Sequence, residues 1–229
     1  MVSCANLNLV ALEIRRLQLA TLRGVDGLDW PVHGFVVSFP GGAALVDTGV
    51  GGPERWLTSW QVVNRSVTAA LDELDMTPGD IGLVINTHLH FDHCGQNAVF
   101  KHAPFYVQRA ELDRARLQSP QLAGWFDFMN ARFELLDGDA EVLPGLRVIA
   151  TPGHTSGHQS VLVDSADGMT DVLVGDAAYK PAQYLDPLTD DLPSGQASDV
   201  AAWRKSIARV MSAEPDRVHF CHHTDVLHT

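Results

Sequence analysis

The stretch of sequence that decides the fold is Asn86-Thr87-His88-Leu89-His90-Phe91-Asp92-His93-Cys94-Gly95. It follows Ile81-Gly82-Leu83-Val84-Ile85, a short apolar run rich in branched residues, which predicts a buried strand. Three histidines and one aspartate therefore stand on a loop at the carboxyl end of a strand. An isolated histidine on a polar loop usually binds nothing, but imidazoles and a carboxylate clustered in this way predict a metal site.

The spacing of these side chains favours two metal ions over one. Alternate side chains of an extended loop leave on the same side, so His88 and His90 can reach one ion. Asp92 and His93 are adjacent and point in different directions, which suits a second ion. A single tetrahedral site usually collects its ligands from two separated pairs instead.

Composition and charge limit the class of protein. The chain has 229 residues, of which 45% are apolar, and no low-complexity linker divides it, so we expect a single domain over residues 1–229. The formal net charge of −12 argues against nucleic acid as the main partner and against simple attachment to an anionic membrane. The sequence leaves the oligomeric state open, with a homodimer as one option.

Three cysteines, Cys4, Cys94 and Cys221, are an odd number without paired spacing, so a reducing compartment is the default expectation. The N-terminus lacks the pattern of a secretory leader, and no apolar run approaches the length of a membrane span. We therefore expect a cytoplasmic protein, although a leader removed beforehand would leave secretion open.

The flanking sequence predicts a mixture of strands and helices. The expected strands are 34–38 and 43–47, joined as a hairpin by Pro40-Gly41-Gly42, and 105–107, 133–136, 145–150, 160–163, 171–174 and 217–221. The expected helices are 66–74, 111–117, 121–132 and a last one through 211 that is capped by Ser198 or Asp199, while residues 9–23 fit either a strand or a helix. We expect residues 180–198 to form a long surface loop.

Aromatic residues in two segments are candidates for the wall of a substrate site. The helix expected over 121–132 carries Trp125, Phe126, Phe128 and Met129, which form either an apolar wall over the metals or part of the core. For Trp56 and Trp60, packing is favoured over lining a pocket.

The ligand loop resembles the HxHxDH signature of the metallo-β-lactamase superfamily. Four other segments resemble that family's early aspartate, second histidine, bridging aspartate and last histidine motifs, and they are Ala44-Leu45-Val46-Asp47-Thr48-Gly49, Thr151-Pro152-Gly153-His154-Thr155-Ser156-Gly157-His158, Val174-Gly175-Asp176 and Phe220-Cys221-His222. The five motifs follow the family's order over nearly the whole chain. The resemblance implies an α/β (α+β) fold, a four-layer αββα sandwich of two mixed β-sheets flanked by helices, with metals at the sheet ends.

The resemblance also implies a dinuclear site with one bridging carboxylate. Its ligands would be His88, His90 and His154 on the first ion, Asp92, His93 and His222 on the second, and Asp176 between them. His223 stands where the family often has an aspartate, which leaves the choice between His222 and His223 open. Asp47 would accept the free ring N–H of a ligand histidine. We expect His158 to bond backbone or pack, and Cys94 and Cys221 to be small buried residues.

Imidazole and carboxylate ligands without a thiolate suit zinc and leave iron, manganese and cobalt open. A bound ion lowers the pKa of water to about 7, which provides a hydroxide nucleophile. Tyr179 follows Asp176 at the interval at which the lactonase branch of the family places a tyrosine facing the substrate carbonyl. We expect the metal-bound hydroxide to attack that carbonyl, the metals and Tyr179 to stabilise the oxyanion, and Asp92 to protonate the leaving oxygen.

The resemblance is greatest to the lactonase branch, which includes the acyl-homoserine lactone lactonases of quorum quenching. It runs through His88 to Gly95, Thr151 to His158, Asp176 to Tyr179, and Trp30 to Phe35. The expected substrate is a small lactone or related ester. The alternatives are a thioester hydrolase of the glyoxalase II type, which usually carries an added C-terminal domain, and a mononuclear iron oxygenase of the same fold, which needs only two histidines and one carboxylate.

Overall fold

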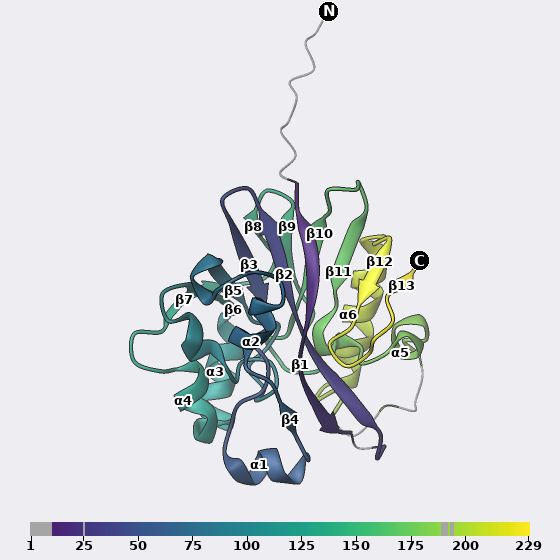
Figure 1. The fold of residues 1–229 in the computed structure, drawn as a ribbon. Coiled ribbons are helices and arrows are strands. Elements are labelled where there is room, and N and C mark those ends of the chain that lie inside the picture. Colours follow the sequence, from purple (N-terminus) through teal and green to yellow (C-terminus); the bar gives the residue numbers. More distant parts are fainter. Residues whose placement is uncertain (1–10, 25, 189–191, 193–194) are drawn as a thin grey trace, which may run out of the picture.

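The structure is a computed structural model that describes residues 11–24, 26–188, 192 and 195–229 (Figure 1). Within this described part the strands form two sheets. The first has the order β4 (Val63–Asn64), β1 (Glu13–Arg23), β2 (Asp29–Phe39), β3 (Gly42–Val46), β5 (Ile81–Ile85), β6 (Pro104–Gln108) and β7 (Arg132–Leu136). The second has the order β13 (Leu227–His228), β12 (Arg217–His219), β11 (Thr170–Leu173), β10 (Gln159–Asp164), β9 (Leu146–Ala150) and β8 (Ala140–Leu143).

Both sheets are mixed. In the first, β1 pairs antiparallel with both β4 and β2, and β2 pairs antiparallel with β3. The neighbours β3, β5, β6 and β7 run parallel to one another. In the second, only β11 and β12 pair in parallel. Parallel neighbours need a crossover, and helices supply crossovers in the first sheet. The predicted class, two mixed sheets with flanking helices, is confirmed.

The apolar residues separate into layers because side chains alternate across each strand. Phe35, Val46 and Ile85 of the first sheet meet Val148 and Val161 of the second in the core between the sheets. The opposite face of the first sheet packs on helix α2 (Val67–Asp72), and that of the second sheet packs on helix α6 (Val200–Ser212). In Figure 1, α2 lies to the left of β1 and α6 lies to the right of β11.

Two predicted helix starts have the expected caps. The Ser66 side chain accepts a hydrogen bond from the backbone N–H of Ala69, and that of Asp199 accepts from Ala202, so each satisfies one of the free N–H groups of the first turn. The predicted helix over 111–117 is present as α3 (Arg109–Gln118). The ambiguous segment 9–23 is the strand β1 from Glu13 onward, while residues 9 and 10 lie outside the described part of the chain.

The helix expected over 121–132 is wrong in extent. A 3₁₀ turn (Pro120–Leu122) and a short helix, α4 (Ala123–Phe126), form there, and the chain then passes through a turn in which Asn130 has a φ of +69°. Asparagine tolerates this left-handed conformation, which reverses the chain so that Arg132 can begin β7. The expected loop 180–198 is also corrected, because it opens with helix α5 (Pro181–Leu185), where proline occupies the first helical position.

Several short helices and strands were not predicted from the sequence. They are α1 (Glu54–Ser59), β4, β8 and β13. Among the described residues, no helix combines the length and the apolar character needed to cross a bilayer.

Candidate metal centre

Four loops at strand ends bring the candidate ligands together. The loop after β5 carries His88, His90, Asp92 and His93, and the loop between β9 and β10 carries His154. Asp176 lies on a short 3₁₀ turn after β11, and His222 follows β12. These side chains are spread along the sequence from His88 to His222, and the two sheets bring them to one place.

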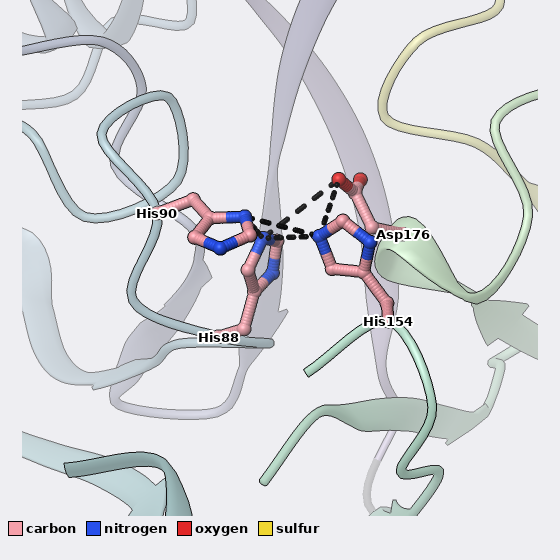
Figure 2. A group of neighbouring side chains, drawn as sticks. All are labelled: His88, His90, His154 and Asp176. Atoms are coloured by element: carbon pink, nitrogen blue, oxygen red, sulfur yellow. Dashed lines mark hydrogen bonds and ion pairs between the residues drawn. The ribbon is translucent and has the colours of Figure 1, made fainter. Parts of the chain in front are cut away.

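The first group of ligands converges on one point (Figure 2). His90 Nδ1 lies 3.0 Å from both His88 Nε2 and His154 Nε2, and those two Nε2 atoms are 3.2 Å apart. Asp176 Oδ2 lies 3.3 Å from His154 Nε2 and 3.7 Å from His88 Nε2. Ligands at about 2.0–2.1 Å around a tetrahedral zinc ion are separated from one another by roughly 3.3 Å, so this donor set fits such an ion.

The second group uses the other oxygen of the same aspartate. Asp176 Oδ1 lies 3.2 Å from His93 Nε2 and 3.3 Å from His222 Nε2. Asp92 Oδ2 completes the group at 3.6 Å from His222 Nε2 and 3.8 Å from His93 Nε2. The carboxylate of Asp176 therefore stands between the two groups, one oxygen toward each.

Two buried atoms of the second group have no hydrogen-bond partner among the described residues. They are His93 Nε2 and Asp176 Oδ1, which face each other without hydrogen-bond geometry. A buried polar atom without a partner costs free energy, and native proteins rarely leave one unexplained. A cation between these atoms and Asp92 would satisfy both, so the residues fit a metal at the second position as well.

The opposite ring nitrogens fix the orientation of the imidazoles. The Nδ1 atoms of His154 and His222 lie 2.9 Å from the carbonyl oxygens of Gln196 and Pro31, so each donates its proton there. The Nδ1 of His88 lies 3.1 Å from the hydroxyl of Thr87. Because Nδ1 carries the proton in these rings, Nε2 keeps the lone pair that a metal requires.

Asp47 holds both His93 and the start of the ligand loop. Its Oδ2 accepts from His93 Nδ1 at 2.8 Å and from Thr87 Oγ1 at 2.7 Å, and its Oδ1 accepts from the Thr87 backbone N–H at 2.8 Å. Asp47 reaches this position with a φ of +59°. The contact predicted for Asp47, acceptance of a ring N–H from a ligand histidine, is present.

His158 supports Asp176 through the backbone. Its Nδ1 lies 2.8 Å from Thr151 Oγ1 and 3.2 Å from Thr151 O, and its Nε2 accepts the backbone N–H of Asp176 at 3.0 Å. Burial lowers the pKa of His158 to about 3, so the ring is neutral and can accept this bond. The expectation that His158 bonds backbone is confirmed.

The neighbours of the ligands behave as small or peripheral residues. Cys94 and Cys221 are buried, as expected, and burial raises the pKa of Cys221 to about 12, which keeps the thiol protonated. Cys4 lies outside the described residues. His223 is one-third exposed and its Nδ1 accepts the backbone N–H of Asp225, so the structure places His222 and not His223 in the cluster.

Burial and the neighbouring charges lower the pKa values of His88 and His90 together, whereas they act in opposite directions on His93 and Asp176. Burial, together with the neighbouring imidazoles, holds the pKa values of His88 and His90 well below the ordinary value. Burial also lowers the pKa of His93, but the carboxylates of Asp176, Asp92 and Asp47 outweigh it and raise that pKa. Burial raises the pKa of Asp176, yet the facing imidazoles lower it well below its usual range. A carboxylate surrounded by imidazoles is thus kept ionised, as a bridging ligand must be.

A cavity of about 380 Å³ opens over the cluster. Its polar floor is formed by His90, Asp92, His154, Asp176 and His222, and its remaining walls by Leu22, Trp30, Trp60, Phe91, Tyr179 and Gly195. Tyr179 packs against Trp30, with ring centroids 5.1 Å apart, and against His222, with centroids 5.3 Å apart. The site therefore pairs ionisable groups with an apolar surface on which a chain or ring can lie.

Of the two alternatives for residues 121–132, cavity wall or core, the structure favours the core. Among the described residues that line the cavity, none belongs to 121–132, because Phe126 is core and Met129 is 86% exposed. Trp60, for which packing was favoured, does line the cavity. Trp56 instead packs edge-on against Phe91.

Comparisons with known proteins agree with this geometry. Residues 28–222 match the model of the metallo-beta-lactamase superfamily. An N-acyl homoserine lactonase of Bacillus cereus is 31% identical over 221 residues, which cover 89% of this chain and 85% of the relative. An N-acyl homoserine lactonase of a Bacillus species is 32% identical over 180 residues, covering 72% and 71%.

Solved structures have the same fold. The structure of a quorum-quenching N-acyl homoserine lactone hydrolase superposes with a TM-score of 0.78 at 25% identity, covering 93% of this chain and 92% of that one. An N-acyl homoserine lactone hydrolase with N-hexanoyl-L-homoserine bound at its catalytic metal centre superposes with a TM-score of 0.75, also at 25% identity, covering 93% of each chain.

Proposed function

The chain belongs to the metallo-β-lactamase superfamily, and from this premise we propose that it is a metal-dependent hydrolase that opens a lactone, an acyl-homoserine lactone or a related ester. The observation that carries the proposal is the position of Asp176. One of its oxygens faces His88 and His154 and the other faces His93 and His222, at the floor of a cavity with apolar walls. The names of the relatives support a lactone as the substrate.

We assign two divalent ions to the site, with zinc as the expected metal. The first would be held by His88, His90 and His154, the second by Asp92, His93 and His222, and Asp176 would bridge them. Bound there, the ions would activate water as a nucleophile near neutral pH and polarise the substrate carbonyl.

The chain's own residues would then orient the substrate and move the protons. Tyr179 borders the cavity beside His154 and Asp176, and burial together with the charges of Asp176 and Asp92 raises the pKa of its phenol, which stays protonated as a hydrogen-bond donor. In our proposal it donates to the carbonyl oxygen as negative charge develops there. In our proposal Asp92, 8% exposed at the cavity floor, takes up the proton that the attacking water gives up and passes it to the leaving alkoxide oxygen as the ester C–O bond breaks.

The apolar walls would select for an acyl substituent. Leu22, Trp30, Trp60 and Phe91 present carbon surface within one cavity. Each methylene of a substrate that leaves water on this surface contributes about 0.8 kcal/mol, so short extensions of the acyl chain should lower KM severalfold until the cavity is filled.

The experiment that tests the proposal is proton release during turnover of a panel of acyl-homoserine lactones, unsubstituted lactones and thioesters. We expect lactone opening that stops when a chelator removes the metal. His222→Asn should abolish turnover and lower the metal content, while the neighbouring His223→Asn should retain both, because His223 lies outside the cluster. Cleavage of thioesters alone would transfer the function to a thioester hydrolase, and oxygen uptake with one iron per chain would indicate an oxygenase.

A further inference from the structure

One buried acidic residue outside the ligand set contacts two of the ligand loops. Glu111 lies in the first turn of α3, and its exposed fraction is 0%. Its Oε1 accepts a hydrogen bond from the backbone N–H of Leu89 at 2.8 Å, and its Oε2 accepts one from the hydroxyl of Thr155 at 2.7 Å. Arg114, one turn along the helix, donates Nη2 to Oε1 at 2.6 Å and Nε to Oε2 at 3.2 Å.

The two loops that Glu111 joins carry the imidazoles of the first group. Leu89 stands between His88 and His90, and Thr155 directly follows His154. The second loop also presses on the helix at Gly157, where an added Cβ would lie 2.1 Å from the backbone nitrogen of Glu111. A single carboxylate thus links the two loops on either side of the point at which the three imidazole nitrogens meet, one through a backbone N–H and the other through a side-chain hydroxyl.

The contacts of Glu111 extend beyond its own helix to both ligand loops. A buried ion pair is often no more stabilising than apolar residues of the same volume, because desolvation of the charges offsets their attraction. The chain contains a comparable buried carboxylate, Asp171, which accepts from Arg217, His219 and Ser165 and touches neither loop. Glu111 differs from Asp171 in what its oxygens hold, since each of them bonds one ligand loop as well as Arg114.

We propose that Glu111 is a positioning residue that sets the distance between His154 and the pair His88 and His90, and thereby the affinity of the first metal position. Arg114 keeps the carboxylate oriented with both oxygens toward the loops. This inference rests on the proposed metal-dependent function, and it assigns a role to a residue that contacts neither metal nor substrate. Partners that orient metal ligands typically account for a 10- to 100-fold effect on metal affinity or activity.

The principal variant is Glu111→Gln, which keeps the size of the side chain. An amide has one acceptor oxygen and no charge, and in either orientation its NH2 group would face a donor, the N–H of Leu89 or the Nε–H of Arg114, so the four bonds that the carboxylate accepts cannot all be kept. We expect the affinity of the first metal position to fall about 10- to 100-fold, with the second metal retained. Thr155→Val should act in the same direction and Thr155→Ser should not, because serine keeps the hydroxyl.

The matched control is Asp171→Asn, which also removes a buried, arginine-paired charge. It should lower the melting temperature without changing the affinity of either metal. The measurement is titration of the metal-free full chain with Zn²⁺ against a chromophoric chelator, with a thermal melt of each metal-free variant to record folding.

The outcomes separate the inference from the function on which it rests. Selective loss of one metal in Glu111→Gln and Thr155→Val, with both retained in Asp171→Asn and Thr155→Ser, supports the role. Two metals bound as tightly by Glu111→Gln as by the wild type would overturn it, as would equal losses in Glu111→Gln and Asp171→Asn. Wild-type protein that binds no metal would overturn the proposed function, and the inference with it.

Discussion

Replacing Tyr179 by phenylalanine removes one hydroxyl group from the cavity and leaves the surrounding packing in place. The ring contacts with Trp30 and His222 depend on the aromatic face, which phenylalanine keeps. The backbone N–H of residue 179 still donates to Gln183 Oε1 at 2.7 Å. The variant should therefore fold with a free energy of unfolding within about 1 kcal/mol of the wild type and bind the same amount of metal.

The size of the expected effect follows from the charge that the hydroxyl would meet. A hydrogen bond to a charged group contributes about 1.5–3 kcal/mol. Since about 1.4 kcal/mol corresponds to a factor of ten in rate, kcat should fall by roughly 10- to 150-fold. The oxyanion exists only beyond the ground state, so KM should change much less than kcat.

The assay is proton release from an acyl-homoserine lactone at constant pH, with kcat and KM determined for the wild type and Tyr179→Phe. Tyr184→Phe is the control, because Tyr184 is buried in the neighbouring helix α5 and does not line the cavity. A kcat for Tyr179→Phe within twofold of the wild-type value would refute the assignment of Tyr179. So would a loss of rate fully explained by a lower metal content.

Three further outcomes are expected, on stability rather than turnover. Gly95→Ala should lower the free energy of unfolding by about 3 kcal/mol in a denaturant titration, because the added Cβ would lie 1.8 Å from the backbone nitrogen of Gly51. Gly124→Ala should raise the free energy of unfolding by about 0.5–1 kcal/mol, because the space around Gly124 is open. Burial lowers the pKa of His33 to about 4 from 6.5, so the unfolded chain takes up a proton at this residue before the folded chain does as pH falls. Between pH 6.5 and 4, the free energy of unfolding of the metal-free wild type should therefore decrease by up to about 3 kcal/mol more than that of His33→Gln. Equal pH profiles of the two proteins would contradict the lowered pKa. Chelation should lower the melting temperature by an amount that grows with the free metal concentration of the starting sample, and a melting temperature insensitive to metal would contradict binding to the folded state.

The parts of the fold that local sequence dictates were predictable. The ligand loop could be located because an apolar run ends at Ile85, three residues before His88, and the starts of α2 and α6 because Ser66 and Asp199 can cap them. The hairpin of β2 and β3 follows from the turn residues at 40–42. In each case the determining interaction lies within a few residues along the chain.

The parts that depend on distant contacts were not predictable from local pattern. Glu111 bonds Leu89, 22 positions away, and Thr155, 44 positions away, and nothing in its own sequence neighbourhood distinguishes it from a surface residue of a helix. For residues 121–132 the choice between cavity wall and core stayed open, because aromatic residues at helical spacing fit a core as well as a cavity. Trp60 lines the cavity only because the α1 region folds back over Phe91.

The most direct test of the dinuclear centre is the metal content per chain of metal-saturated, desalted protein, measured by elemental analysis on the same preparation that is assayed for lactone opening. We expect about two metal ions per wild-type chain and lactone opening that is lost on chelation and restored by added Zn²⁺. A content of one ion per chain, or lactone opening that survives complete removal of the metal, would contradict this expectation.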